Sequence, residues 1–253
     1  MLIQTAAEQV GATVVLLGYN RGIAFALNMG RKIAREHGNS WLATFDQDSM
    51  ATPEMIKQMA LAYQSYPYPD RIGIISPCHV DRRLGIMVGD QSYEVAGPGW
   101  RVIGLTMTSG NLVNLDAAEA VEGFDDSLFI DSVDHDFCFR LRERGYQVLE
   151  ATYAVLHHSL GNLERRWFIY RWVTVSNHPA LRRYYMSRNR LILWRQYWKR
   201  RPVWVIRDIK RVLLDTLLVI LYEKQPGAKL RMAMHGFLDG IKNVRGAFTP
   251  NPP

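Results

Sequence analysis

The sequence is poor in cysteine and has no long uninterrupted apolar segment. Its 253 residues include two cysteines, Cys78 and Cys138, which excludes a disulfide framework and is typical of a reducing compartment. The first residues lack the basic start and the apolar run of a signal peptide. The longest apolar run near the C-terminus, residues 212–222, is interrupted by Asp215 and is too short to span a bilayer. These absences predict a cytoplasmic protein that does not cross a membrane.

Acidic residues are scarce in the last third of the chain. Residues 1–164 contain 12 Lys and Arg against 20 Asp and Glu, a net charge of −8, whereas residues 165–253 contain 19 against 4, a net charge of +15. This asymmetry predicts an acidic zone suited to a metal ion and a basic zone that faces an anionic partner. We therefore divide the chain into a domain over 1–164 and a basic, aromatic-rich helical extension over 165–253.

Short apolar runs alternate with helical patterns through the first domain. The patterns predict strands over 11–17, 41–45, 72–76, 102–108 and 153–158, and helices over 22–37, 53–65, 115–122 and 133–145. The glycine-rich residues 81–100 suit an irregular or antiparallel insertion. Such alternation predicts an α/β fold, with a mainly parallel sheet flanked by helices.

Two carboxylates follow one of the predicted strands. Because alternate side chains of a strand lie on one face, Asp46 and Asp48 emerge together where the strand ends. Paired carboxylates at such a position attract a hard divalent cation. The alternative is two solvated acids in a turn, and this pair alone does not exclude it.

A second acidic cluster precedes and opens the predicted helix at Val133. Asp131, Asp134 and Asp136 lie in its first turn or just before it, where the helix dipole favours acids. The functional interpretation is a general base near a reactive atom. His158, at the end of the last predicted strand, is either a structural histidine or a third metal ligand.

The extension begins with a run of interleaved cations and aromatic residues. Residues 165–211 contain 14 Lys and Arg and one acid, Asp208. The stretch 182–201 has the composition of a helix lying in a membrane interface and facing anionic lipid. A solvated helical face is the alternative, and no recognised nucleic-acid module is present.

Several motifs in order resemble the family 2 glycosyltransferases, specifically their bacterial rhamnosyltransferase branch. They include the turn around Asn20, Gly22 and Asn28, the sequence Phe45-Asp-Gln-Asp-Ser49, and Thr108-Ser-Gly-Asn111. The others are Gly123-Phe-Asp-Asp, the stretch 129–140, His158-Ser-Leu-Gly161 and Tyr184-Tyr-x-x-Arg188-Asn189. The resemblance implies a GT-A fold and an inverting transfer of a sugar, with dTDP-L-rhamnose as the expected donor.

The resemblance also implies roles for individual residues. Asp46 and Asp48, with His158, would hold Mg²⁺ or Mn²⁺ against the donor diphosphate, and Asp134 would be the general base. Donor and acceptor binding would fall to Asn20, Gly22, Asn28, Asp46, Ser109, Gly110, Asn111, Asp131 and Asp136. The implied acceptor is a glycan or a lipid-linked glycan of cell-surface polysaccharide synthesis. That places the protein at the inner face of the cell membrane, on an anionic surface, with homo-oligomers left open.

The chain departs from the family at its start. Nothing in residues 1–18 matches the family's first two strands, so we expect the sheet to lack them. A non-catalytic, membrane-associated remnant of a transferase is therefore an alternative. The motif around Asp46 also resembles the aspartyl nucleophile of haloacid-dehalogenase-type phosphatases, but that family does not account for the other motifs.

Overall fold

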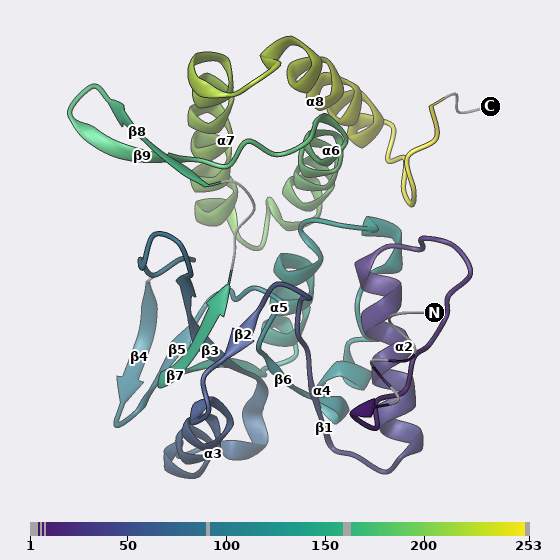
Figure 1. Ribbon diagram of the computed structural model, residues 1–253, viewed down its shortest axis with the longest axis vertical. Helices are drawn as coiled ribbons and strands as arrows, with labels where there is room; N and C mark the ends of the chain where they lie inside the picture. The colour runs from purple at the N-terminus through teal and green to yellow at the C-terminus, as the bar shows by residue number, and fades with distance from the viewer. Residues whose placement is uncertain (1–4, 6, 8, 90–91, 159–162, 251–253) are drawn as a thin grey trace.

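The computed structural model describes residues 5, 7, 9–89, 92–158 and 163–250 (Figure 1). A mixed sheet occupies one half of the molecule, with α3 on one face and α2, α4 and α5 on the other. Helices α6, α7 and α8 form the other half, from which a two-stranded hairpin projects. The predicted α/β class is confirmed, and the arrangement is consistent with a GT-A-like fold.

The helices and strands have the following bounds. The sheet is built from β1 (Trp41–Ala43), β2 (Met50–Ala51), β3 (Ile72–Asp81), β4 (Tyr93–Gly97), β5 (Trp100–Ile103), β6 (Leu112–Asn114) and β7 (Gln147–His158). Its helices are α2 (Ile23–Glu36), α3 (Met55–Ser65), α4 (Leu115–Ala120) and α5 (Val133–Glu143), with short 3-10 turns at Pro69–Arg71 and Asp126–Leu128. The hairpin β8 (Glu164–Phe168) and β9 (Arg171–Val175) leads to α6 (Ala180–Tyr197), α7 (Pro202–Tyr222) and α8 (Pro226–Ile241).

The sheet is organised around its two longest strands, β3 and β7. These strands pair in parallel at the centre of the order β1-β6-β3-β7-β5-β4, and β2 adds to the end of β7. Strands β2, β5 and β6 run antiparallel to their neighbours, so β1, β3, β4 and β7 share one direction. The carboxyl ends of β1 and β7 therefore open toward the same edge of the sheet, which is where a ligand site forms in open α/β sheets.

Two hydrophobic cores use alternate residues of the same strands. Ile74 and Val148 face α2, α4 and α5, whereas Ile75 and Leu149 face α3. Strands buried on both faces read as continuous apolar runs, which explains the Ile-rich start of β3. Residues of α6, such as Leu193, join the first of these cores. The division of the chain at residue 164 stays a prediction.

The basic stretch 182–201 is largely a core helix. Arg188, Asn189 and Tyr197 of α6 are fully buried, and Tyr184 is nearly so. The Arg188 guanidinium donates to the carbonyl oxygens of Gly246 (2.6 Å) and Leu128 (3.1 Å). The interpretation of this stretch as a helix lying along lipid is wrong for these residues, because sequence composition does not reveal carbonyl groups that pair with buried cations.

Two further expectations differ from the structure. Residues 12–17 form no strand, and Val15 and Leu16 are exposed. This apolar run has the composition of a strand but no neighbouring strand to pair with. The extension also does not begin with helices, since residues 164–175 form the β8–β9 hairpin.

No helix in the described part of the chain is both long enough and apolar enough to cross a membrane.

Close packing of α6 against α8 yields a test of the fold. Gly236 of α8 lies so near α6 that a Cβ atom there would come within 3.0 Å of the backbone of Tyr184, whereas a Cβ at Gly227 would meet nothing within 4 Å. We expect Gly236→Ala to lower the free energy of unfolding by about 1–3 kcal/mol through overpacking. Gly227→Ala should leave it unchanged or raise it by up to about 1 kcal/mol. Urea unfolding of both variants measures this, and equal stabilities would contradict the packing.

Candidate active site

A cavity of about 790 Å³ lies at the sheet edge where β1 ends, between the sheet and α6 and α7. The segments that line it come from distant parts of the chain. They are residues of α2, the segment 42–48, Met107 and Thr108, the segment 130–135, His158, Arg182, Met186 and Arg190 of α6, and Trp204 and Asp208 of α7. Five predicted site residues line this one cavity: Asp46, Asp48, Asp131, Asp134 and His158.

Asp46, Asp48 and His158 form a cluster with the spacing of a metal site. One ligand atom from each lies within 4.8 Å of the others. His158 Nδ1 is 3.4 Å from Asp48 Oδ1, and His158 Nε2 is 4.0 Å from Asp46 Oδ2. Burial raises the pKa of Asp46, and the nearby His158 opposes this rise. The two carboxylates are the ligand type that Mg²⁺ and Mn²⁺ prefer, so this pair fits the expected ion, and the His158 imidazole is a ligand type more typical of transition metals.

Strand pairing and hydroxyl groups hold this cluster in place. Pairing of Met50 in β2 with His157 in β7 brings the turn 46–49 beside His158. Ser49 Oγ lies 2.9 Å from His158 Nδ1 and 2.6 Å from Ser109 Oγ. Ser109 Oγ in turn accepts a hydrogen bond from the Asp46 backbone N–H (3.0 Å). Outer contacts of this kind orient the residues that hold a metal.

Ser109, Gly110 and Asn111 do not line the cavity, but they form hydrogen bonds to the segment 44–46, which does. The Gly110 N–H donates to Thr44 O (2.6 Å), and the Thr44 N–H donates to Asn111 O (3.0 Å). Gly110 has a φ of 81°, and a Cβ there would come within 3.0 Å of Leu156 and Pro77. The turn needs glycine because its backbone lies against β3 and β7, and it supports the strand end that carries Asp46.

Asp134 opens α5 and points into the cavity beside His135. Its Oδ1 accepts a hydrogen bond from the His135 backbone N–H (2.8 Å) and lies 2.9 Å from His135 Nδ1. Burial would raise the pKa of Asp134, but the charge and hydrogen bonds of His135 bring it below the ordinary value. Burial lowers the pKa of His135, but the Asp134 carboxylate outweighs burial, so this pKa is raised. Asp134 is therefore ionised at neutral pH.

Asp131 lies across the cavity from the sheet and pairs with Arg182 of α6. Arg182 donates through Nε (3.2 Å) and Nη2 (3.1 Å) to the two carboxylate oxygens. Burial raises the pKa of Asp131, and Arg182 lowers it. Asp131 and Ser132 have φ angles of 64° and 65°, values that residues other than glycine rarely adopt. The segment before α5 is thus held in an unusual conformation at the cavity wall.

Three further predicted binding residues, Asn20, Gly22 and Asn28, also lie outside the cavity. Asn20 accepts a hydrogen bond from the Gly22 N–H (3.0 Å), and a Cβ at Gly22 would come within 3.0 Å of the Phe129 backbone. Asn28 donates to Phe124 O (2.8 Å) and accepts from Phe124 N–H (3.0 Å). The N-terminus of α2 also donates to a protein carbonyl, because the Ile23 N–H bonds to Phe129 O. These residues attach α2 to the loop 124–129.

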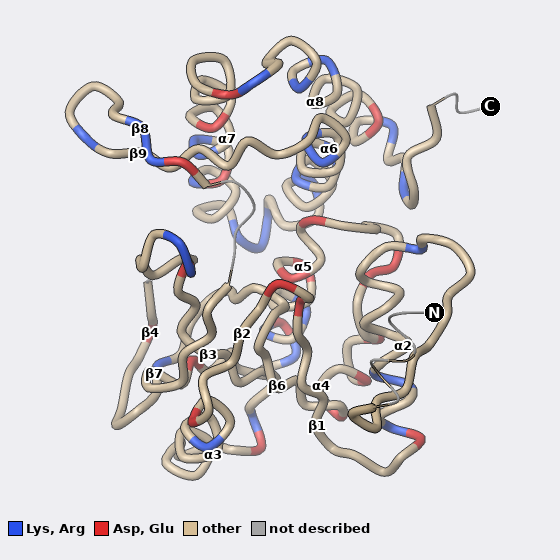
Figure 2. The backbone as a smooth tube through the Cα atoms, in the orientation of Figure 1, with Lys and Arg blue, Asp and Glu red and all other residues tan. Residues whose placement is uncertain are grey.

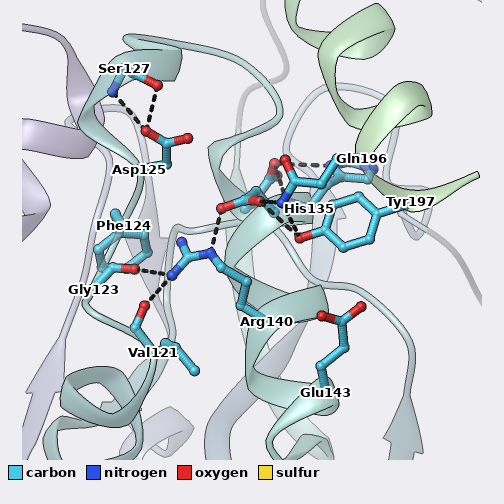
Figure 3. Close-up of polar contacts among 12 residues, drawn as sticks. Val121, Gly123, Phe124, Asp125, Ser127, His135, Arg140, Glu143, Gln196 and Tyr197 are labelled. Carbon is cyan, nitrogen blue, oxygen red and sulfur yellow. Dashed lines mark hydrogen bonds and ion pairs between the residues drawn. The ribbon is translucent and has the colours of Figure 1, made fainter. Parts of the chain in front are cut away.

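Asp136 is also outside the cavity and is buried between α5 and α6. Figure 3 shows its partners Arg140, Gln196 and Tyr197. Arg140 Nε donates to its carboxylate (2.7 Å), and Tyr197 OH does the same (2.9 Å). Arg140 also donates to the carbonyl oxygens of Gly123 (2.7 Å) and Val121. The contacts of Asp136 thus join α5 to α6 and to the loop after α4.

Comparisons with known proteins favour the resemblance drawn from the motifs. No protein-family model matches the chain. The chain is 27% identical over 252 residues to dTDP-rhamnosyl transferase RfbF of Shigella flexneri, across 92% of this chain and 79% of the relative. The resemblance predicted from the motifs is confirmed, since the chain is similar to a rhamnosyl transferase. Part of the motif His158-Ser-Leu-Gly161 lies outside the described residues.

Sequence reasoning missed the side of the cavity that α6 and α7 supply. Arg182, Arg190 and Trp204 line it, and Arg190 lies 3.7 Å from both Asp208 and Asp215. The arginines were counted as part of a lipid-facing stretch. The spacing of Arg182 and Arg190 from the buried Arg188 could not show which cations face the cavity, because that depends on how α6 packs.

The buried network around Asp136 yields a test of stability. Asp136→Ala leaves Arg140 without its buried carboxylate, and loss of one partner of a buried pair costs about 3–5 kcal/mol. Tyr197→Phe removes one donor and should cost only about 1 kcal/mol. Urea unfolding measures both. An Asp136→Ala variant as stable as Tyr197→Phe would contradict a structural role for this carboxylate.

Proposed function

We propose that the protein transfers a sugar from a nucleotide-sugar donor to an acceptor hydroxyl with inversion at the anomeric carbon. The observation that carries the proposal is one cavity that holds the cluster Asp46, Asp48 and His158 together with the ionised carboxylate of Asp134. The donor we propose is dTDP-rhamnose, which is supported by the similarity to the dTDP-rhamnosyl transferase of Shigella flexneri.

The metal cluster would receive the donor diphosphate. Asp46, Asp48 and His158 would hold Mg²⁺ or Mn²⁺, which supplies Lewis-acid stabilisation of the negative charge on a leaving diphosphate. Arg182 and Arg190 line the same cavity, and guanidinium groups match phosphate oxygens in geometry and charge. Arg182 would have to exchange its contact with Asp131 for the donor, a change that its partly exposed side chain permits.

Asp134 would take the proton of the acceptor hydroxyl as that oxygen attacks the anomeric carbon from the face opposite the diphosphate. A base must be ionised before the reaction, and the hydrogen bonds from His135 keep Asp134 in that state. His135 also restricts the carboxylate to one orientation. The second oxygen, Oδ2, is the one available to the acceptor.

We extend the proposal to the setting of the reaction. The acceptor is a glycan or lipid-linked glycan of cell-surface polysaccharide synthesis, and the protein binds the inner face of the membrane, alone or as a homo-oligomer. The net charge of +15 over residues 165–253 supports attraction to anionic lipid. Figure 2 shows how Lys and Arg gather on the helical half.

The first test concerns the metal cluster. We expect Mn²⁺ to tighten dTDP binding to the wild-type chain, and Asp48→Ala to reduce that metal-dependent gain at least about tenfold, since one of the two carboxylates is lost. Asp70→Ala, at an exposed acid outside the cavity, is the matched control. Calorimetric titration with and without Mn²⁺ measures both. Unchanged metal dependence in Asp48→Ala would refute the ligand assignment, and a folded wild type without metal-dependent binding would favour a non-catalytic remnant.

The second test concerns the base. Asp134→Asn preserves shape and removes basicity, so we expect the turnover rate to fall by about 10²–10⁴-fold while dTDP affinity stays unchanged. Asp116→Asn, at the corresponding first-turn position of α4 and outside the cavity, should retain full activity. Release of dTDP from dTDP-rhamnose, with soluble alkyl glycosides as acceptors, measures turnover. Full activity in Asp134→Asn would exclude it as the base.

A further inference from the structure

The β8–β9 hairpin projects from the helical half of the molecule (Figure 1), and several of its apolar side chains are exposed. Its strands pair in register, with Trp167 opposite Trp172 and Phe168 opposite Arg171, so Ile169 and Tyr170 form a two-residue tip. Ile169 is 73% exposed and Tyr170 is 75% exposed. An apolar tip on a projecting hairpin has no role in the packing of this chain.

The two faces of the hairpin differ in what they contact. Phe168, Val173 and Val175 pack against Leu214, Leu218 and Tyr222 of α7, and Tyr222 OH donates to Trp167 O (2.7 Å). The indole rings of Trp167 and Trp172 contact each other edge to face, with centroids 5.5 Å apart. They remain 54% and 57% exposed. The hairpin is thus anchored by one face and presents a tryptophan pair to its surroundings.

The backbone of the tip is unfavourable for the residue that occupies it. Ile169 has a φ of 55°, a region that suits Gly or Asn and is rare for a β-branched side chain. A polar turn residue would satisfy this conformation with less strain. The isoleucine therefore serves something other than hairpin formation, and an exposed apolar residue under strain points to a binding role.

A stripe on α7 extends the apolar surface. Leu213, Leu217, Ile220 and Leu221 recur at helical spacing and are all exposed. They adjoin the sector of α7 that holds the hairpin, because Leu214, Leu218 and Tyr222 follow them around the helix. Hairpin and stripe therefore adjoin one another across α7.

The charges beside this surface select an anionic partner. Arg165 lies over the Trp172 ring, 5.4 Å from its centroid, and Arg166 and Arg171 are exposed on the same hairpin. Apolar residues form the tip, the tryptophan pair lies behind them, and Arg165 and Arg166 lie nearer the base, whereas Arg171 is beside the tip. Apart from Arg171, this order matches the change from hydrocarbon to headgroup across a bilayer interface. We propose that the β8–β9 hairpin and the α7 stripe form the surface by which this protein docks on an anionic lipid bilayer.

This inference rests on the membrane association proposed above and replaces the stretch 182–201 as its contact surface. It involves no step of sugar transfer. Loss of docking would therefore leave metal-dependent dTDP binding unchanged, and the two proposals can fail separately.

The experiment is co-sedimentation of the full chain with vesicles of equal parts phosphatidylglycerol and phosphatidylcholine. We expect the double change Trp167→Ser with Trp172→Ser to weaken vesicle binding at least tenfold. Trp198→Ser, at a tryptophan that is 51% exposed at the end of α6, should change it less than twofold. The double change Arg165→Gln with Arg166→Gln should weaken binding to these vesicles and leave binding to pure phosphatidylcholine unchanged. Circular dichroism verifies that each variant is folded.

Other outcomes would overturn the inference. Wild-type protein that does not sediment with the vesicles has no such docking surface. Equal binding by the hairpin variant and by Trp198→Ser would place the contact elsewhere on the chain. If light scattering shows that the wild type is a dimer and the hairpin variant a monomer, while the variant still binds vesicles, a second copy covers this surface.

Quenching of tryptophan fluorescence by brominated lipid measures insertion directly. Quenching that is lost in the hairpin variant alone would support the inference.

Discussion

The side-chain amide of Asn189 determines the shape of the candidate active site. Its nitrogen lies 2.8 Å from Leu128 O, 2.8 Å from Ile130 O and 2.9 Å from Asp131 O, and the group is fully buried. The adjacent Arg188 guanidinium adds a bond to Leu128 O. Together they hold a segment in which Phe129, Asp131 and Ser132 all have positive φ. Such a conformation persists only where surrounding groups over-determine it.

This clamp links two halves of the molecule that the charge pattern separates. The segment 128–132 leads directly into α5, so its conformation sets where Asp134 begins the helix and where Asp131 meets Arg182. Because the clamp residues come from α6, the acidic half of the cavity depends on the basic half for its geometry. A buried cation and amide that pair with backbone carbonyls are costly to leave without partners. That cost couples folding of the extension to formation of the site.

The metal cluster depends on a different constraint, the pairing of two short strands with longer ones. Strand β1, which leads to Asp46, pairs with β6, and β2 pairs with the end of β7 beside His158. The turn between β1 and β2 is short, so Asp48 has little freedom once both ends are paired. Ser109 then links this turn to the neighbouring turn that contains Gly110. The site is thus preorganised by backbone pairing rather than by the carboxylates themselves.

The amino-acid sequence was enough to place the residues whose position follows from a strand end or a helix start. Asp46 and Asp48 follow a strand, Asp134 opens a helix and His158 ends a strand, so their common edge follows from strand direction. Tertiary packing decided the rest. Asp136 follows Asp134 by two residues and so lies on another face of α5, where packing of α6 gives it Tyr197 as a partner, and Asn28 meets the loop at Phe124 instead of the cavity. Likewise, interleaved Arg and Tyr residues have the same composition in a lipid-facing helix and in a core helix. Only the carbonyl groups that α6 meets in the folded chain distinguish the two, and those carbonyls come from distant segments.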